Sequence, residues 1–201
     1  MATILVTCFE PFGGEARNAS QEAVSRLPET VDGCRLVRDV LPVCFGTAAA
    51  RAGQAIDALR PGAVLCVGQA AGRSALTPER VALNLADTAR PDNAGCCPVD
   101  VPIVPGGPAA YFTTLPVKAM AAVITAAGAP AAVSCSAGTY VCNDLFYRLR
   151  HGYPELPLGF LHVPALPGSG REGPSLPVEV TLRGLAAALR CVAAFLAGAE
   201  R

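Results

Sequence analysis

Short apolar runs alternate with amphipathic stretches along most of this chain. The apolar runs predict strands over residues 4–9, 34–41, 63–68, 131–136 and 158–163. The amphipathic stretches predict helices over residues 19–27, 47–59, 116–127, 141–149 and 182–198. Strands that alternate with helices are typical of a parallel sheet covered on both faces. The sequence therefore predicts an α/β fold, a three-layer α/β/α sandwich around a largely parallel, mixed sheet.

The length and continuity of the chain predict one domain. At 201 residues the chain is long enough for a single sizeable core, and it contains no internal repeat, low-complexity tract or linker. We therefore expect a single domain over residues 1–201, with long loops at 86–108 and 164–177. In folds of this class, functional groups collect where strands end at their carboxyl side.

Charge and hydropathy exclude several classes of partner. Sixteen basic and sixteen acidic residues give a formal net charge of zero, without a Lys/Arg stripe, so we expect no nucleic-acid partner. The apolar runs are short and broken by Gly and Pro, so we expect no membrane span. The N-terminus lacks a signal-peptide pattern, which predicts a cytoplasmic protein with reduced thiols. A chain that is 52% hydrophobic and 16% charged is expected to have apolar surface that association can bury, which favours a homo-oligomer.

One of the nine cysteines stands at a position suited to a nucleophile. Cys142 follows the predicted strand 131–136 and the turn S-A-G-T, in the first turn of the predicted helix 141–149. The unpaired N–H groups and the positive end of a helix favour a thiolate there. Free cysteines are more often buried packing residues, and Cys8, Cys66 and Cys135 fit that description. We therefore expect Cys142 to be the reactive thiol.

A histidine base has two candidates, because the chain contains only two histidines. His151 lies in the last turn of the Cys142 helix, just before a glycine, where a cation complements the helix dipole. His162 lies at the end of the predicted strand 158–163, and a histidine there is more often structural than catalytic. Because its position matches that of Cys142 at a strand end, His162 is the better candidate.

The acid that would orient the imidazole cannot be chosen from spacing. A Cys/His pair needs a third group for this purpose. Thr77-Pro78-Glu79 also has the pattern of a helix start, and that interpretation is slightly favoured locally. The candidates are Glu79, Asp87, Asp92, Glu10 and Asp144.

Metal and phosphate sites are not indicated. The chain has no C-x-x-C spacing, and neither histidine stands at a finger-like interval from a cysteine pair, so we expect no metal and no cofactor. G68-Q-A-A-G-R is a glycine-spaced loop after a strand, but it lacks the Lys-Ser/Thr pair of a P-loop and the third glycine of a dinucleotide fingerprint.

Several motifs together resemble one known family. They are T7-C-F-E-P-F-G-G, G68-Q-A-A-G-R, T77-P-E-R-V-A-L-N, P91-D-N, A110-Y-F-T-T-L-P-V-K-A-M, S136-A-G-T-Y-V-C-N and G159-F-L-H-V-P. In this order they resemble the successive signatures of the pyroglutamyl peptidase I family, the pyrrolidone carboxyl peptidases. The resemblance implies a cytosolic cysteine exopeptidase, an omega peptidase with an α/β/α fold that removes an N-terminal pyroglutamyl (5-oxoproline) residue from peptides. It also implies a homotetramer, or at least a dimer.

The resemblance implies roles for individual residues. The nucleophile falls on Cys142, the histidine on His162 and the orienting acid on Glu79. The pocket for the lactam ring falls on Phe9, Phe12 and Tyr140, with Gln69 beside it. This agrees with the chemistry of pyroglutamate, a compact lactam without a free α-amine, which suits an apolar, aromatic pocket with a few amide-type partners.

Two departures from the family pattern bear on activity. The family usually shows D-A-R-I-P-D-N, with an arginine that assists the oxyanion, whereas this chain reads D87-T-A-R-P-D-N. Ala89 stands at the arginine position and Arg90 follows one residue later, so we expect Arg90 to point elsewhere unless the loop shifts. Tyr140 replaces the usual phenylalanine and adds a hydroxyl to the ring pocket. An alternative function is therefore a catalytically weak relative that binds lactam-capped peptides or small amide ligands, and a thiol redox or metal-handling protein is a remote third.

Overall fold

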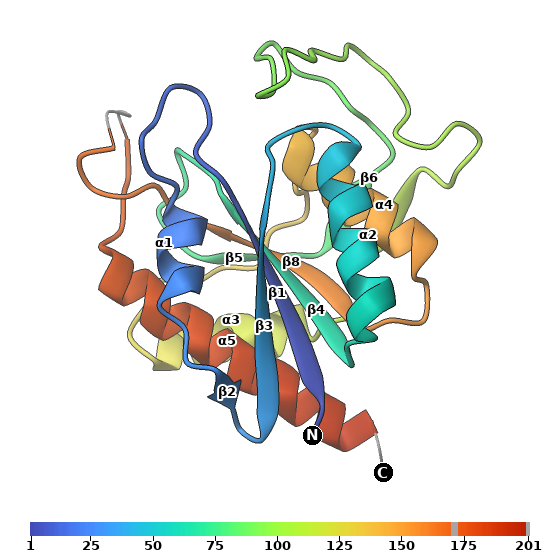
Figure 1. Cartoon of the computed structure of the whole chain (residues 1–201). Coiled ribbons are helices and arrows are strands. Elements are labelled where there is room, and N and C mark those ends of the chain that lie inside the picture. The colour runs from blue at the N-terminus through green and yellow to red at the C-terminus, as the bar shows by residue number, and fades with distance from the viewer. Residues whose placement is uncertain (170–172, 200–201) are drawn as a thin grey trace.

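The computed structural model describes residues 1–169 and 173–199, and its centre is a six-stranded mixed sheet (Figure 1). The strand order is β2-β3-β1-β4-β8-β5. The four central strands are mutually parallel, and the two edge strands run antiparallel to their neighbours. The bounds are β1 Thr3–Phe9, β2 Thr30–Val31, β3 Cys34–Leu41, β4 Ala63–Gln69, β5 Thr77–Glu79 and β8 Leu158–Val163. The predicted α/β class and the largely parallel sheet are confirmed.

Helices cover both faces of the sheet. One face carries α1 (Ala19–Ser25), α3 (Val117–Ala126) and α5 (Val178–Ala199). The other carries α2 (Thr47–Leu59) and α4 (Val141–Gly152). Side chains of a strand alternate between faces, and in β1 Ile4 and Val6 pack on the α5 side while Leu5 packs on the α4 side. Both faces are therefore apolar, which explains why β1 and β4 appear in the sequence as nearly continuous hydrophobic runs.

The predicted strand at 131–136 is not a strand in the structure. Its residues make only isolated bridges, Leu76 with Ala131 and Glu79 with Ser134, beside β5. Pro78, in the middle of β5, has no N–H to donate, so the ladder between the two segments is interrupted. One consequence is that Cys135 is exposed rather than a packing thiol.

Four short strands were not predicted. They are β2, β5 and the antiparallel pair β6 (Val81–Leu83) and β7 (Ala110–Phe112). A strand of two or three residues is too short to show a hydrophobic period. The interpretation of Thr77-Pro78-Glu79 as a helix start is wrong, because these residues pair with β8 as strand β5.

The C-terminal helix is longer and more apolar than predicted. It begins at Val178 rather than at 182, and its segment Val178–Gly198 has the length and hydropathy of a membrane span. Half of that segment is buried within the fold, where α5 packs against α1 and α3. These contacts are those of a core helix.

Candidate active site

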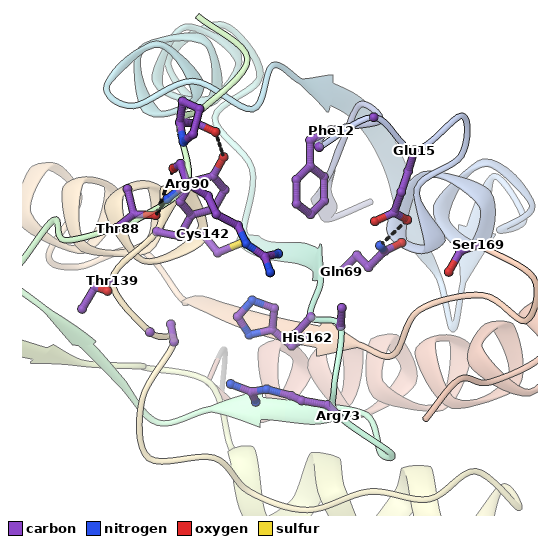
Figure 2. Close-up of a pocket in the computed structure, with 18 residues that line it drawn as sticks. Phe12, Glu15, Gln69, Arg73, Thr88, Arg90, Thr139, Cys142, His162 and Ser169 are labelled. Carbon is purple, nitrogen blue, oxygen red and sulfur yellow. Dashed lines mark hydrogen bonds between the residues drawn. The ribbon is translucent and has the colours of Figure 1, made fainter. Parts of the chain in front are cut away.

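A cavity of about 670 Å³ opens beyond the carboxyl ends of the parallel strands (Figure 2). Its wall comes from the loop after β1, the end of β4 and the turn after it, the 88–91 loop, the turn before α4, and β8. Among the side chains that line it are Phe12, Gln69, Arg73, Arg90, Tyr140, Cys142 and His162. The structure thus brings Cys142 and His162, which are twenty residues apart in the sequence, to one cavity.

Cys142 lies in the first turn of α4, with its sulfur above the sheet. Gly68, near the end of β4, lies beneath it: a Cβ atom on Gly68 would come within 2.9 Å of Cys142 Sγ and 2.8 Å of Phe160 Cζ. Gly68 is also paired with His162 in the register of β4 and β8. The missing side chain at Gly68 therefore leaves the space that the Cys142 sulfur occupies next to the His162 strand.

We expect Gly68→Ala to damage both stability and the position of the thiol. The added methyl group would overpack the site, so the free energy of unfolding should fall by about 1–3 kcal/mol. Gly152→Ala is the matched control, because a Cβ atom there would meet nothing within 4 Å. Denaturant unfolding of both variants, together with the rate at which iodoacetamide alkylates Cys142, tests this expectation. Equal stability and equal alkylation rates in the two variants would contradict the packing argument.

His162 is oriented by Glu79. The His162 Nδ1 and Glu79 Oε1 atoms are 2.7 Å apart, and the Glu79 side chain is 0% exposed. In the antiparallel pairing of β5 with β8, Glu79 lies opposite Phe160, so His162 is its diagonal neighbour on the same face. With Nδ1 donating to the carboxylate, Nε2 is left to accept a proton. This is the arrangement that an imidazole base requires.

Burial controls the protonation of both reacting groups. Loss of solvation lowers the pKa of His162 below its usual value, although the neighbouring Glu79 carboxylate acts in the opposite direction. Loss of solvation, followed by the charge of Glu79, raises the pKa of the Cys142 thiol to about 12. Burial therefore opposes the thiolate that the helix end favours at Cys142. Both shifts favour the uncharged pair, a thiol and a neutral imidazole.

Arg73 is a member of this cluster that the sequence analysis missed. Its Nη1 atom lies 2.6 Å from Glu79 Oε1 and also contacts Thr77 Oγ1, and its Nη2 atom donates to the Ser136 carbonyl at 3.3 Å. The signal was present in the sequence, because G68-Q-A-A-G-R ends only a few residues before Thr77-Pro78-Glu79. No residue pattern, however, indicates that the loop turns back toward the acid.

The predicted ring pocket is reproduced in part. Phe12 and Tyr140 line the cavity with ring centroids 6.3 Å apart, and Phe45 packs against Tyr140 edge to face at 5.5 Å. Phe9 is only 2% exposed and belongs to the core beneath the cavity rather than to its wall. Gln69 lines the cavity, where its side-chain amide accepts from the Ala19 N–H and donates to Glu15. The aromatic wall is thus formed by Phe12 and Tyr140.

Arg90 lines the cavity, contrary to the expectation that it points elsewhere. Figure 2 shows its side chain directed into the cavity from the 88–91 loop. The backbone of Arg90 is held by Thr88, whose hydroxyl accepts from Arg90 N and donates to Arg90 O, both at 3.0 Å. The Tyr140 hydroxyl donates to the Pro91 carbonyl at 3.0 Å. That hydroxyl therefore tethers the loop that carries Arg90.

The start of α4 offers backbone donors to the cavity. The N–H groups of Asn143 and Asp144 donate to the Tyr140 carbonyl at 2.9 and 3.1 Å. The N–H groups that precede them belong to the first helical turn, which has no intrahelical acceptor. Together with the positive end of the helix dipole, they form a site suited to a developing oxyanion near Cys142.

Other chemistries lack a comparable site. Within residues 1–169 and 173–199, no group of three or more His, Cys, Asp and Glu side chains is placed to hold a metal ion. His151 does not line the cavity; its Nδ1 atom lies 2.8 Å from the Tyr111 hydroxyl, and its ring stacks on Tyr147.

Comparison with known proteins identifies relatives of this chain. The model of the pyroglutamyl peptidase family matches residues 2–194. The pyrrolidone-carboxylate peptidase of Levilactobacillus brevis is 54% identical over 196 residues, which cover 94% of this chain and 96% of the relative. That of Escherichia fergusonii is 51% identical over 181 residues, covering 88% and 85%.

Solved structures of similar proteins have the same fold. The crystal structure of pyroglutamyl peptidase I from Bacillus amyloliquefaciens matches with a TM-score of 0.92 and 41% identity, covering 96% of this chain and 98% of that one. A mutant pyrrolidone carboxyl peptidase from Pyrococcus furiosus matches with a TM-score of 0.90 and 38% identity, covering 96% and 99%. Sequence and structure thus point to the same relatives over nearly the whole chain.

Proposed function

The chain belongs to the pyroglutamyl peptidase family, and from that premise we propose that it is a cysteine exopeptidase whose single domain, residues 1–201, uses Cys142, His162 and Glu79 to remove N-terminal pyroglutamyl residues from peptides. The observation that carries this proposal is the cavity in which Cys142 and His162 meet, with His162 Nδ1 2.7 Å from the buried Glu79. Each member of this set has one of the roles that acyl transfer needs.

The first chemical step follows from the protonation states. Nε2 of the neutral His162 takes the Cys142 proton as the sulfur attacks the pyroglutamyl carbonyl, and the resulting imidazolium protonates the leaving amine. Glu79 stabilises the imidazolium while it exists. Water then hydrolyses the acyl-enzyme, with His162 acting as the base. The N–H groups at the start of α4 hold the oxyanion in both steps.

The aromatic wall supports recognition of the lactam. Phe12 and Tyr140 offer apolar faces to a compact ring, and the Tyr140 hydroxyl is engaged by the Pro91 carbonyl. That hydroxyl therefore does not bring an unpaired polar group into the ring pocket. Phe9 supports the wall from the core, and Gln69 supplies an amide at the edge of the cavity.

Arg90 supports full rather than weak activity. It is a cation directed into the cavity, so the displaced arginine no longer favours a catalytically weak relative that binds lactam-capped peptides. In this proposal Arg90 stabilises the oxyanion from the 88–91 loop, which the Tyr140 hydroxyl joins to the turn before α4.

We expect Arg90→Ala to lower kcat/KM by about 10- to 100-fold. Loss of one oxyanion donor in a water-excluded site lowers kcat by roughly 10²–10³, and the effect should be smaller here because Arg90 is exposed. Arg35→Ala is the matched control, since Arg35 is also exposed but lies at the start of β3, at the other end of the sheet. Steady-state kinetics on a pyroglutamyl amide measure both. An Arg90→Ala enzyme as active as Arg35→Ala would remove Arg90 from the mechanism.

The assembly and location of the enzyme are further parts of the proposal. We place it in the cytoplasm as a homo-oligomer, a tetramer or a dimer. Self-association is supported by large apolar side chains on the surface, of which Val99 and Phe112 are 68% and 67% exposed. Light scattering at several concentrations measures the assembly.

Release of a fluorophore from its pyroglutamyl amide tests the function. Glutamyl and prolyl amides of the same fluorophore are the controls, because one lacks the ring and the other lacks the lactam carbonyl. Saturable hydrolysis of the pyroglutamyl amide alone is the expected result. A folded, reduced sample without turnover, or one that hydrolyses the prolyl amide equally well, would overturn it.

A further inference from the structure

We propose that Arg73 is a positioning residue of this active site, whose guanidinium holds the Glu79 carboxylate against His162 and keeps the imidazole in its neutral, proton-accepting form. The inference rests on the proposed function, because it gives Arg73 a task in the same acyl transfer. It is carried by the contacts of Arg73 with two neighbouring segments, strand β5 and the segment that leads to α4.

The Glu79 carboxylate is deeply buried and is held by two donors. Its Oε1 atom lies 2.6 Å from Arg73 Nη1 and 2.7 Å from His162 Nδ1, so one oxygen serves both partners. Among the described residues, its Oε2 atom has no hydrogen-bond partner. The carboxylate is therefore held by these two donors alone within that part of the chain. A buried carboxylate that lost one of them would be free to rotate or to withdraw from the ring.

Arg73 is itself anchored to two neighbouring segments of the chain. Its guanidinium contacts Thr77 on β5 and donates to the Ser136 carbonyl at 3.3 Å, in the segment that leads to α4. Its side chain is 27% exposed, so it reaches the buried acid from the cavity wall. Arg73 thus joins the strand that carries the acid to the turn that precedes the nucleophile.

The positive charge of Arg73 offsets the negative charge of Glu79 next to His162. Arg73 and Glu79 are opposite charges on either side of one oxygen atom, and His162 shares that oxygen. Without Arg73, the full negative charge of Glu79 would act on the imidazole and favour its protonated form. The positive charge of Arg73 itself also lowers the pKa of His162, in addition to the larger effect of burial. A protonated His162 cannot accept the Cys142 proton, so this charge balance sets the low-pH limit of activity.

The two histidines of the chain allow this to be measured without a substrate. Proton NMR of the imidazole signals gives the titration midpoint of His162, and His151→Gln assigns the other signal. We expect Arg73→Gln to raise the His162 midpoint by about 1 pH unit, in the range that a neighbouring charge produces. The acid limb of kcat/KM should move upward by the same amount, and kcat should fall by roughly tenfold or more because the carboxylate is no longer fixed.

Two further variants separate charge from structure. Arg73→Lys keeps the charge without the planar fork, so its His162 midpoint should stay near that of the wild type while kcat falls only in part. Arg51→Gln removes an exposed ion pair with Asp39, whose Nη2–Oδ1 distance is 2.7 Å, and should change neither quantity.

Each outcome decides the inference independently of turnover. An unchanged His162 midpoint in Arg73→Gln, or a midpoint in Arg73→Lys that moves as far as that in Arg73→Gln, would overturn it. If Arg73→Gln does not fold, Arg73→Met, which also removes the charge but keeps an apolar stem, takes its place, and an unchanged His162 midpoint in Arg73→Met would overturn the inference. A guanidinium that only bound substrate would raise KM and leave the His162 titration of the free protein unchanged. Absence of wild-type turnover would overturn the proposed function and leave the titration as a test of the cluster.

Discussion

Cys142→Ser is expected to reduce hydrolysis of a pyroglutamyl amide by at least about 10⁴-fold while the fold stays intact, because the sulfur is the only reacting atom that the substitution changes. A serine hydroxyl is a far weaker nucleophile than a thiol, and His162, with its lowered pKa, is a weak base toward it. The serine hydroxyl is smaller than the sulfur that fits the space left by Gly68, so the substitution does not overpack the site. The measurement is kcat/KM of the two proteins, with circular dichroism as the check on folding.

A second cysteine serves as the control for this experiment. Cys135 is exposed and does not line the cavity, so Cys135→Ser should retain wild-type kinetics. Inactivation by iodoacetamide should follow modification of Cys142, identified by mass spectrometry among the nine cysteines. Substantial turnover by Cys142→Ser, or inactivation that tracks a different cysteine, would show that another group is the nucleophile.

The central architecture was predictable because its residues are buried on both sides. The strand at 158–163 and the helix at 47–59 have the predicted bounds, since an apolar run marks the first and a clear helical period the second. The strand at 34–41 also has its predicted bounds, although charged residues interrupt its apolar ones. The segment 131–136 is equally apolar yet forms no strand. Its sheet neighbour, β5, is interrupted by Pro78, and that contact is not visible in the local sequence.

The site was predictable where a residue lies near the end of an element with a clear local pattern, and less so where it depends on strand pairing. Cys142 and His162 stand at the ends of elements that local pattern identifies. Glu79 could be chosen among five acids only through the family resemblance, because its reach to His162 depends on the antiparallel pairing of β5 with β8. Arg73 was missed for the same reason, and the direction of Arg90 depends on how the 88–91 loop folds.

Glu79→Gln is expected to lower kcat by about 10²–10⁴-fold with little change in KM, because the acid acts on the imidazolium that forms during the reaction rather than on bound substrate. The amide is nearly the same size as the carboxylate, and Arg73 requires an acceptor at the Oε1 position. The amide oxygen should therefore stay between Arg73 and His162, so the substitution removes the charge and leaves the shape. The imidazolium would then form beside the unbalanced charge of Arg73.

The double variant Arg73→Gln/Glu79→Gln distinguishes this charge argument from a simple loss of contacts. If the imidazolium in Glu79→Gln is penalised by the unbalanced Arg73, removal of that charge should recover part of the lost kcat, so the double variant should be more active than Glu79→Gln alone. Asp39→Asn, which releases the exposed Arg51, controls for the loss of any one ion pair. Strictly multiplicative losses would mean that Arg73 and Glu79 act separately. A double variant only as active as the weaker single variant would mean that the two residues act as one structural unit, and the charge balance around His162 would not limit the reaction.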